Sequence, residues 1–140
     1  TGKNITILGF SFKANTNDTR ESPSIEICRN LLFEGANLTI HDPRVSEEQI
    51  SKELLNDYAL NKNSISDLGI WKYEESIHKS FQGSDAVVIL TEWEEYKNLD
   101  WQEISLKMRK PAWVFDTRLI INKEKVLLSG LNFWGLGDGT

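Results

Sequence analysis

The chain has one cysteine, no excess of positive charge and no long apolar run, and each shortage excludes a class of protein. Cys28 alone cannot form an internal disulfide or a cysteine-rich zinc site. A net charge of -5 and a pI near 5.1 leave no basic excess to neutralise phosphates of a nucleic acid. No apolar run approaches the roughly 18 residues that span a bilayer. We therefore expect no nucleic-acid or membrane partner, and the cysteine content suits the cytoplasm.

The chain also lacks the glycine-rich loop of ordinary dinucleotide-binding domains. That loop needs G-x-G-x-x-G after the first strand, because the backbone must approach a pyrophosphate closely. Here the apolar segment 5–8 is followed by Gly9 and then by FSFK. The segment therefore disfavours binding of a whole dinucleotide in the ordinary way.

No constellation of catalytic or metal-binding residues stands out. His41 and His78 have no serine or cysteine partner at a spacing typical of a triad, and no cluster has metal-ligand spacing. Cys28 lies on the apolar face of an expected helix, where a free cysteine is usually an inert small hydrophobe. Four tryptophans could stack a base, but we interpret most of them as core residues: Trp93, Trp101, Trp113 and Trp134. We predict no catalytic residue and no metal site.

Strand and helix patterns alternate along the whole chain. Its 140 residues and 39% hydrophobic content suit one core, so we expect residues 1–140 to be a single domain. Strands are predicted at 4–9, 36–41, 71–73, 85–90, 112–116 and 131–135. Helices are predicted from Ser22-Pro23 to Gly35 and at 46–55, 74–82, 99–108 and 123–129. This order predicts a Rossmann-like, doubly wound α/β fold with a mostly parallel six-stranded sheet and helices on both faces.

Three polar segments leave strands where such folds bind ligands, beyond the carboxyl ends of the strands. They are 11–21, 91–93 and 117–118, and the first and last lie close together if strands one and five both flank the switch region. Lys13, Arg20 and Arg118 could bind a phosphate, although a lone loop lysine is most often a solvated charge and each arginine could simply form a local ion pair. Asp42 stands where an acid contacts a ribose in dinucleotide-binding folds, but without the glycine loop we favour a turn made with Pro43.

Three segments resemble one known family in the right order. The stretch GFSFKANTNDTRESPSIEICRNLLFEGANLTIHDPRV resembles the start of the C-terminal, UDP-binding domain of the UDP-glucose/GDP-mannose dehydrogenase family. GSDAVVILTEWEEYKNLDW and MRKPAWVFDTRLI look like its next two landmarks, and GLNFWGLG resembles its closing strand. The likeness covers almost the whole chain.

The resemblance implies a function that composition does not. Enzymes of this family oxidise the C6 hydroxyl of a nucleotide sugar to a carboxylate in two NAD-dependent steps, through intermediates on a cysteine. The family has an N-terminal NAD-binding domain, a central helical segment that supports homo-oligomers, and a C-terminal domain that holds UDP or the UDP-sugar. The resemblance therefore implies that this chain is a fragment, inactive alone, whose NAD is bound mainly by the missing N-terminal domain and whose catalytic cysteine is not Cys28.

Four residues match the family's functional positions. Phe12 and Lys13 match a pair that contacts the substrate, and Arg118 matches an arginine that helps to hold it. Arg20 matches an arginine that reaches the NAD held by the other domain. The family often has glycine where this chain has Thr117, which raises a question about the local backbone conformation.

The segment Thr91-Glu92-Trp93 matches a further landmark, which we interpret as structural, holding the wall of the cleft. TEWEEY and NDTRES favour UDP-glucose as the substrate. GDP-mannose or a UDP-N-acetylhexosamine is the alternative within the family. A non-catalytic domain for assembly or regulation is the alternative outside enzymes, because the glycine loop and catalytic cysteine are missing.

Overall fold

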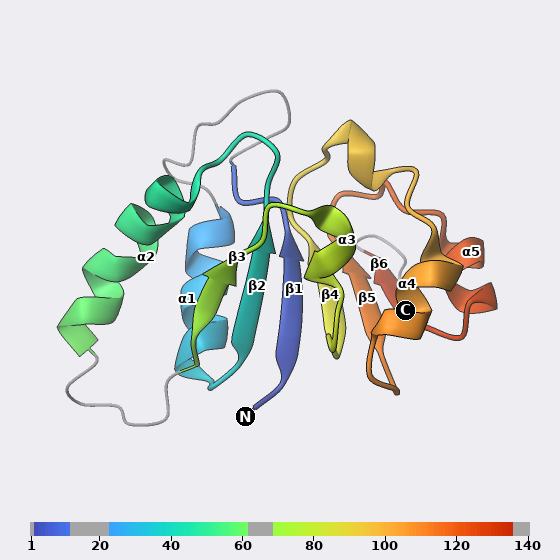
Figure 1. Cartoon of the computed structure of the whole chain (residues 1–140), viewed down its shortest axis with the longest axis horizontal. Coiled ribbons are helices and arrows are strands. Elements are labelled where there is room, and N and C mark those ends of the chain that lie inside the picture. The colour runs from blue at the N-terminus through green and yellow to red at the C-terminus, as the bar shows by residue number, and fades with distance from the viewer. Residues whose placement is uncertain (1, 12–22, 62–68, 136–140) are drawn as a thin grey trace.

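A central sheet of parallel strands organises the molecule (Figure 1). The computed structural model describes residues 2–11, 23–61 and 69–135. Its strands are β1 (Asn4–Leu8), β2 (Asn37–His41), β3 (Trp71–Tyr73), β4 (Ala86–Ile89), β5 (Trp113–Asp116) and β6 (Asn132–Gly135). They form a six-stranded sheet in the order β3-β2-β1-β4-β5-β6, and every neighbouring pair is parallel. The predicted Rossmann-like fold is confirmed, with a sheet that is wholly parallel.

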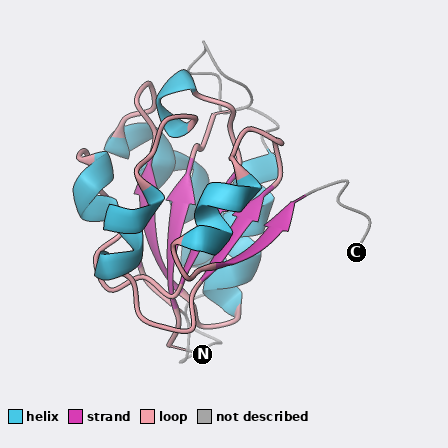
Figure 2. Cartoon of the chain, turned by 90° about the vertical axis from the view of Figure 1, so that its right-hand side faces the viewer, coloured by secondary structure: helices cyan, strands magenta, loops and turns pink. Residues whose placement is uncertain are grey.

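Helices cover both faces of this sheet (Figure 2). They are α1 (Pro23–Phe33), α2 (Glu47–Asn61), α3 (Ile77–Ser80), α4 (Trp101–Lys107) and α5 (Lys123–Leu128), with a 3-10 turn η1 (Glu94–Tyr96) that the sequence did not predict. Right-handed crossovers put helices on opposite faces when the chain moves in opposite directions across a sheet. Figure 1 accordingly shows α1 and α2 beside β2 and β3, and α4 and α5 at the β5–β6 end.

Two hydrophobic cores result, one on each face. Ile7 and Leu8 are adjacent in β1, so their side chains point to opposite faces, and both are fully buried. Ile7 belongs to the first core, with side chains of β2, α1 and α2, and Leu8 to the second, with side chains of β4, β5, α4 and α5. Cys28 of α1 is fully buried in the first core, as predicted.

Two helices differ from their predicted bounds. Helix α2 runs to Asn61 rather than 55, because no glycine or proline interrupts it and the polar residues at its end tolerate helix. Helix α3 begins at Ile77 rather than 74, because Ser76 is its N-cap and accepts a hydrogen bond from Lys79 N. Neither change alters the sheet order. Within the described part of the chain, no helix combines the length and apolarity needed to span a bilayer.

Candidate functional site at the carboxyl edge of the sheet

The carboxyl ends of β1 and β4 lie side by side at the point where the strand order reverses. In doubly wound folds this is where ligands bind. The sequence led us to expect that the strands before segments 11–21 and 117–118 both flank this point. Strand β5 does not flank the switch region, because β4 lies between β1 and β5. The segment after β4 therefore has to connect the other two.

Asp42 is the centre of the hydrogen bonding at this edge. Its Oδ2 accepts from the backbone N–H of Phe10 at 2.8 Å and Ser11 at 3.1 Å, and from Trp93 Nε1 at 3.1 Å. Its Oδ1 accepts from the backbone N–H of Arg44 and the residue after it, at 2.8 and 3.2 Å. The turn role predicted for Asp42 is confirmed. With both oxygens engaged and only 1% of the residue exposed, Asp42 is turned inward rather than toward a ribose.

Gly9 and Thr91 hold the ends of β1 and β4 in close contact. Gly9 has a φ of +101°, and a Cβ there would lie 2.4 Å from Thr91 Cβ. Thr91 in turn donates its hydroxyl to the carbonyl of Ser11 at 3.0 Å. Only glycine combines this conformation with this approach, so its role here is packing of the two strand ends. The structural role predicted for Thr91 and Trp93 agrees with these contacts.

Arg118 is presented at the same edge by the loop after β5. Asp116 shapes that loop, because its Oδ1 accepts from Arg118 N at 2.9 Å and its Oδ2 from Ile120 N and Ile121 N at 2.9 and 2.8 Å. The Arg118 side chain donates from both Nε, at 2.9 Å, and a terminal nitrogen to Oε2 of Glu92. Glu92 therefore holds a guanidinium that remains 30% exposed.

The loop after β5 does not need glycine at position 117. Among the described non-glycine residues, the one with positive φ is Leu119, at 61°. Thr117 instead donates its hydroxyl to the carbonyl of Ile89 at 2.6 Å. The question raised by the missing glycine is thus answered: threonine adopts an ordinary conformation and binds the end of β4.

A buried histidine–tyrosine pair lies behind the edge. His41 Nδ1 and the Tyr96 hydroxyl are 2.9 Å apart, and this hydroxyl also donates to the His41 carbonyl at 3.1 Å. Burial lowers the pKa of His41, against the opposing effect of the Asp42 and Glu74 carboxylates. Burial also raises the pKa of Tyr96 well above its ordinary value. Sequence reasoning missed this pair, although TEWEEY contained its tyrosine.

The other predicted site residues cannot be placed. Phe12, Lys13 and Arg20 lie outside the described residues. The residue before them, Ser11, is fully buried and joined to both Asp42 and Thr91, so the start of their loop is fixed.

The described residues offer binding groups rather than a reactive centre. Burial raises the pKa of the Cys28 thiol to about 12, so it is not a nucleophile near neutral pH. Searched over the described residues, His, Cys, Asp and Glu form no group of three able to hold a metal ion. Phe10 is fully buried where a dinucleotide cradle needs open backbone, so this edge does not fit NAD in the ordinary way. Arg118 provides forked donors suited to a phosphate or sugar oxygen.

The tryptophans divide into two pairs. Trp93 and Trp101 are 6% and 4% exposed, which confirms the expectation of core packing. Trp113 and Trp134 are 41% and 38% exposed. For these two the expectation was wrong, because they project from the edge half of the sheet onto a face that no described crossover helix covers.

Comparison with known proteins gives one consistent family. The sequence model described as "UDP-glucose/GDP-mannose dehydrogenase family, UDP binding domain" matches residues 6–123. UDP-glucose 6-dehydrogenase 4 of Oryza sativa subsp. japonica is 37% identical over 147 residues, covering 97% of this chain and 30% of the relative. UDP-glucose 6-dehydrogenase 2 of Arabidopsis thaliana is 39% identical over 142 residues, covering 96% and 30%.

Solved structures agree. The UDP-D-ManNAc dehydrogenase of Pyrococcus horikoshii has a TM-score of 0.68 at 29% identity, covering 99% of this chain and 26% of that one. A UDP-glucose dehydrogenase of Pyrobaculum islandicum has a TM-score of 0.63 at 27% identity, covering 96% and 25%. The chain thus spans about 30% of the length of the curated relatives it matches. A family match over most of its length, on the predicted fold and with its landmarks at one edge of the sheet, shows that the chain belongs to the UDP-glucose/GDP-mannose dehydrogenase family, as its UDP-binding domain.

Proposed function

We propose that residues 1–140 are the C-terminal, nucleotide-sugar-binding domain of a UDP-glucose 6-dehydrogenase, which oxidises UDP-glucose to UDP-glucuronate with two NAD. The observation that carries this proposal is the match of nearly the whole chain to curated UDP-glucose 6-dehydrogenases at 35–39% identity. In the intact protein the domain binds UDP or UDP-glucose, and its other partners are the N-terminal and central domains of the same polypeptide in a cytoplasmic homo-oligomer.

The substrate site lies at the carboxyl edge of the sheet. Arg118 supplies forked donors to the sugar nucleotide, and Phe12 and Lys13 contact it from the loop after β1. Two contacts support a shared site: Thr91 is bonded to Ser11, which directly precedes that loop, and the next residue, Glu92, holds Arg118. The segment after β4 thereby joins the two substrate-binding segments.

NAD and the covalent chemistry belong to other parts of the polypeptide. NAD supplies the two-electron oxidation at each step, and it is bound mainly by the N-terminal domain, with Arg20 reaching toward it. The described residues do not fit a dinucleotide cradle, because Phe10 is buried where such a cradle needs an open backbone. The buried thiol of Cys28 is unsuited to attack. The fragment alone is therefore expected to be inactive.

The test is a substrate panel on the full-length protein. UDP-glucose is expected to give two NADH per molecule oxidised, whereas GDP-mannose and UDP-N-acetylhexosamines give little. A preference for GDP-mannose or a UDP-N-acetylhexosamine would mean that the substrate is another nucleotide sugar used by the same family. A UDP-N-acetylhexosamine is the alternative to test first, because one of the similar solved structures is a UDP-D-ManNAc dehydrogenase.

Variants of the substrate-binding residues separate binding from assembly. Lys13→Ala and Arg118→Ala are each expected to raise the KM for UDP-glucose at least tenfold, the loss expected on removing a charge-assisted hydrogen bond worth about 1.5–3 kcal/mol. If both variants kept the KM and kcat of the parent, the domain would serve assembly or regulation instead.

A further inference from the structure

The crossovers leave one region of the sheet without a helix. Helices α1 and α2 pack in the first core, with side chains of β1 and β2, and α4 and α5 pack in the second, with side chains of β4 and β5. Each group thus covers one half of one face. On the opposite face of β1–β3, the short crossover helix α3 packs beside β2, and its Ser80 carbonyl accepts a hydrogen bond from Thr6 Oγ1 at 2.6 Å. The opposite face of β4–β6 receives no crossover helix among the described residues.

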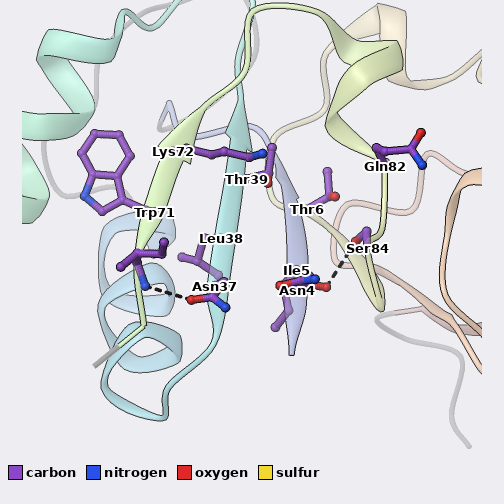
Figure 3. A pocket seen from close by; sticks show the side chains of 11 residues that line it. Asn4, Ile5, Thr6, Asn37, Leu38, Thr39, Trp71, Lys72, Gln82 and Ser84 are labelled. Atoms are coloured by element: carbon purple, nitrogen blue, oxygen red, sulfur yellow. Dashed lines mark hydrogen bonds between the residues drawn. The ribbon is translucent and has the colours of Figure 1, made fainter. Parts of the chain in front are cut away.

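The region over β1–β3 beside α3 is polar. Thr6, Thr39 and Lys72 occupy successive strands there, in register with one another. With neighbouring side chains they line a hollow of about 240 Å³, in which the Lys72 side chain extends from β3 across β2 toward Thr39 (Figure 3). Thr6 is buried under α3, Thr39 is half-buried and Lys72 is exposed, so this region grades from the cover of α3 to a polar surface.

The uncovered region over β4–β6 is aromatic. Trp113, Phe115 and Trp134 alternate with residues of the second core, so they project from the opposite face. The rings of Trp113 and Phe115 stack at 5.7 Å between centroids, and Phe115 lies 6.4 Å from Trp134. We call these three residues the aromatic face. Both tryptophans of the aromatic face are about two-fifths exposed. The region over β1–β3, by contrast, has threonine and lysine side chains at its surface.

We propose that the aromatic face is an internal interface, covered by a helix of the same polypeptide from outside residues 1–140. Parallel sheets are normally covered on both faces. The chain spans only about 30% of its curated relatives, which leaves more than enough polypeptide for such a helix. The inference rests on the proposed function, because it takes the chain to be one domain of a longer dehydrogenase.

The size of the patch favours a tethered segment over a second copy. Two tryptophans exposed by about two-fifths leave on the order of 200 Å² open. A stable interface between separate proteins buries about 800 Å² on each partner. A single helix joined to the domain covers the smaller area without losing the translational freedom that free partners lose.

Hydroxyl-radical footprinting of the full-length protein tests the cover. Trp93 and Trp101, which are buried by this domain itself, provide internal references. If the aromatic face is covered, Trp113 and Trp134 should react with hydroxyl radicals as slowly as these two references. Labelling several-fold faster than the references would overturn the proposal.

Photo-crosslinking identifies the occupant. Trp134→p-benzoylphenylalanine in a mixture of ¹⁴N- and ¹⁵N-labelled full-length chains is expected to give links within one chain, to a peptide outside residues 1–140. Links between chains of different label would assign the face to a second copy and overturn the proposal. Oxidation of UDP-glucose is assayed separately on the unmodified protein. An active enzyme with an open aromatic face contradicts only this inference, and a covered face without that activity contradicts only the proposed function.

A pair of charge substitutions adds a readout of stability. Trp134→Lys puts a charge on the aromatic face, and Lys72→Glu changes a charge in the polar region. The first is expected to lower the Tm of the full-length protein by several degrees and the second to leave it nearly unchanged. Equal, small effects would contradict a covered aromatic face.

Discussion

At Asp42, one carboxylate accepts hydrogen bonds from the segments that follow β1, β2 and β4. Asp42→Asn replaces one acceptor oxygen with a donor and leaves buried N–H groups without a partner. We expect the free energy of unfolding to fall by about 2–4 kcal/mol. Urea denaturation of the 140-residue chain measures the change.

Asp100→Asn is the matched control for this substitution. Asp100 is the N-cap of α4, and its carboxylate accepts one exposed hydrogen bond from Glu103 N at 3.2 Å. Asparagine is an equally good N-cap, so the control should lose less than about 1 kcal/mol. A comparable loss in both variants would show that Asp42 does not have the central role described above.

Glu92 is expected to act on substrate binding through Arg118. Glu92→Gln keeps the shape of the side chain but removes its charge, so Arg118 is held less firmly at the edge. In the full-length dehydrogenase proposed above, the KM for UDP-glucose should rise several-fold while kcat changes little. Glu94→Gln, which alters an 83% exposed partner of Lys97, is the control. An unchanged KM in Glu92→Gln would separate Glu92 from the substrate site.

Individual residues were predictable where the reason was local. The Asp42 turn was predicted because its acceptors and donors lie within three residues of one another. The pairs Glu92–Arg118 and His41–Tyr96 were not, because each joins residues far apart in sequence. Such pairing depends on which strands become neighbours, and hydrophobic patterns do not determine that.

At the scale of the element, the contact between the ends of β1 and β4 depends on Gly9. Gly9→Ala adds a Cβ that would lie 2.4 Å from Thr91 Cβ, at a φ of +101° that side chains rarely adopt. Conformational strain and overpacking each cost about 1–3 kcal/mol, so we expect a loss of roughly 2–5 kcal/mol in urea denaturation.

Gly83→Ala separates the two effects. Gly83 has a φ of +71°, and an added Cβ would meet nothing within 4 Å. This variant therefore carries the conformational cost without the contact and should lose about 1 kcal/mol. If both alanines cost the same, the approach of Thr91 would not matter for stability.

The strands were more predictable than the helices. Each buried strand is a short β-branched or aromatic run between turn residues, and all six were predicted to within two residues at each end. Helices α2 and α3 were misjudged because their ends depend on caps and breakers. The acidic residues before Ser76 conceal its role as the N-cap of α3, and the polar end of α2 has the composition of an irregular segment.

Across the whole molecule, stability is expected to fall in mild acid. Burial holds the pKa of His41 below its ordinary value of 6.5 in the folded state. Below pH 6.5 the unfolded chain therefore binds a proton that the folded chain does not. This contribution to the free energy of unfolding is complete above pH 6.5 and is lost as the pH falls toward the folded-state pKa.

Denaturation at pH 7.5 and 5.5 measures this effect. His41→Gln should show a smaller pH dependence than the parent over that window. His78→Gln, at the other histidine of the chain, which is exposed, should behave like the parent. A pH dependence that persists in His41→Gln would assign the effect to other groups.

The doubly wound fold class followed from the alternation of strand and helix patterns, whereas the strand order, with β4 between β1 and β5, did not. The aromatic face did not follow from it. The run Trp-Val-Phe-Asp of β5 predicts a strand with two buried faces. The pattern of the sequence does not indicate that one of these faces is partly exposed, as the structure shows for Trp113.

The buried position of Cys28 makes its rate of alkylation a measure of how often the first core opens. Its thiol is sealed between α1 and the sheet in the first core, and no other cysteine occurs in the chain. Alkylation in native buffer should therefore occur only when the half of the molecule that contains the first core opens. Mass spectrometry measures the rate of alkylation. Ile40→Ala, in the same core, should accelerate alkylation more than Val114→Ala in the other core, and equal rates would mean that the two halves open together.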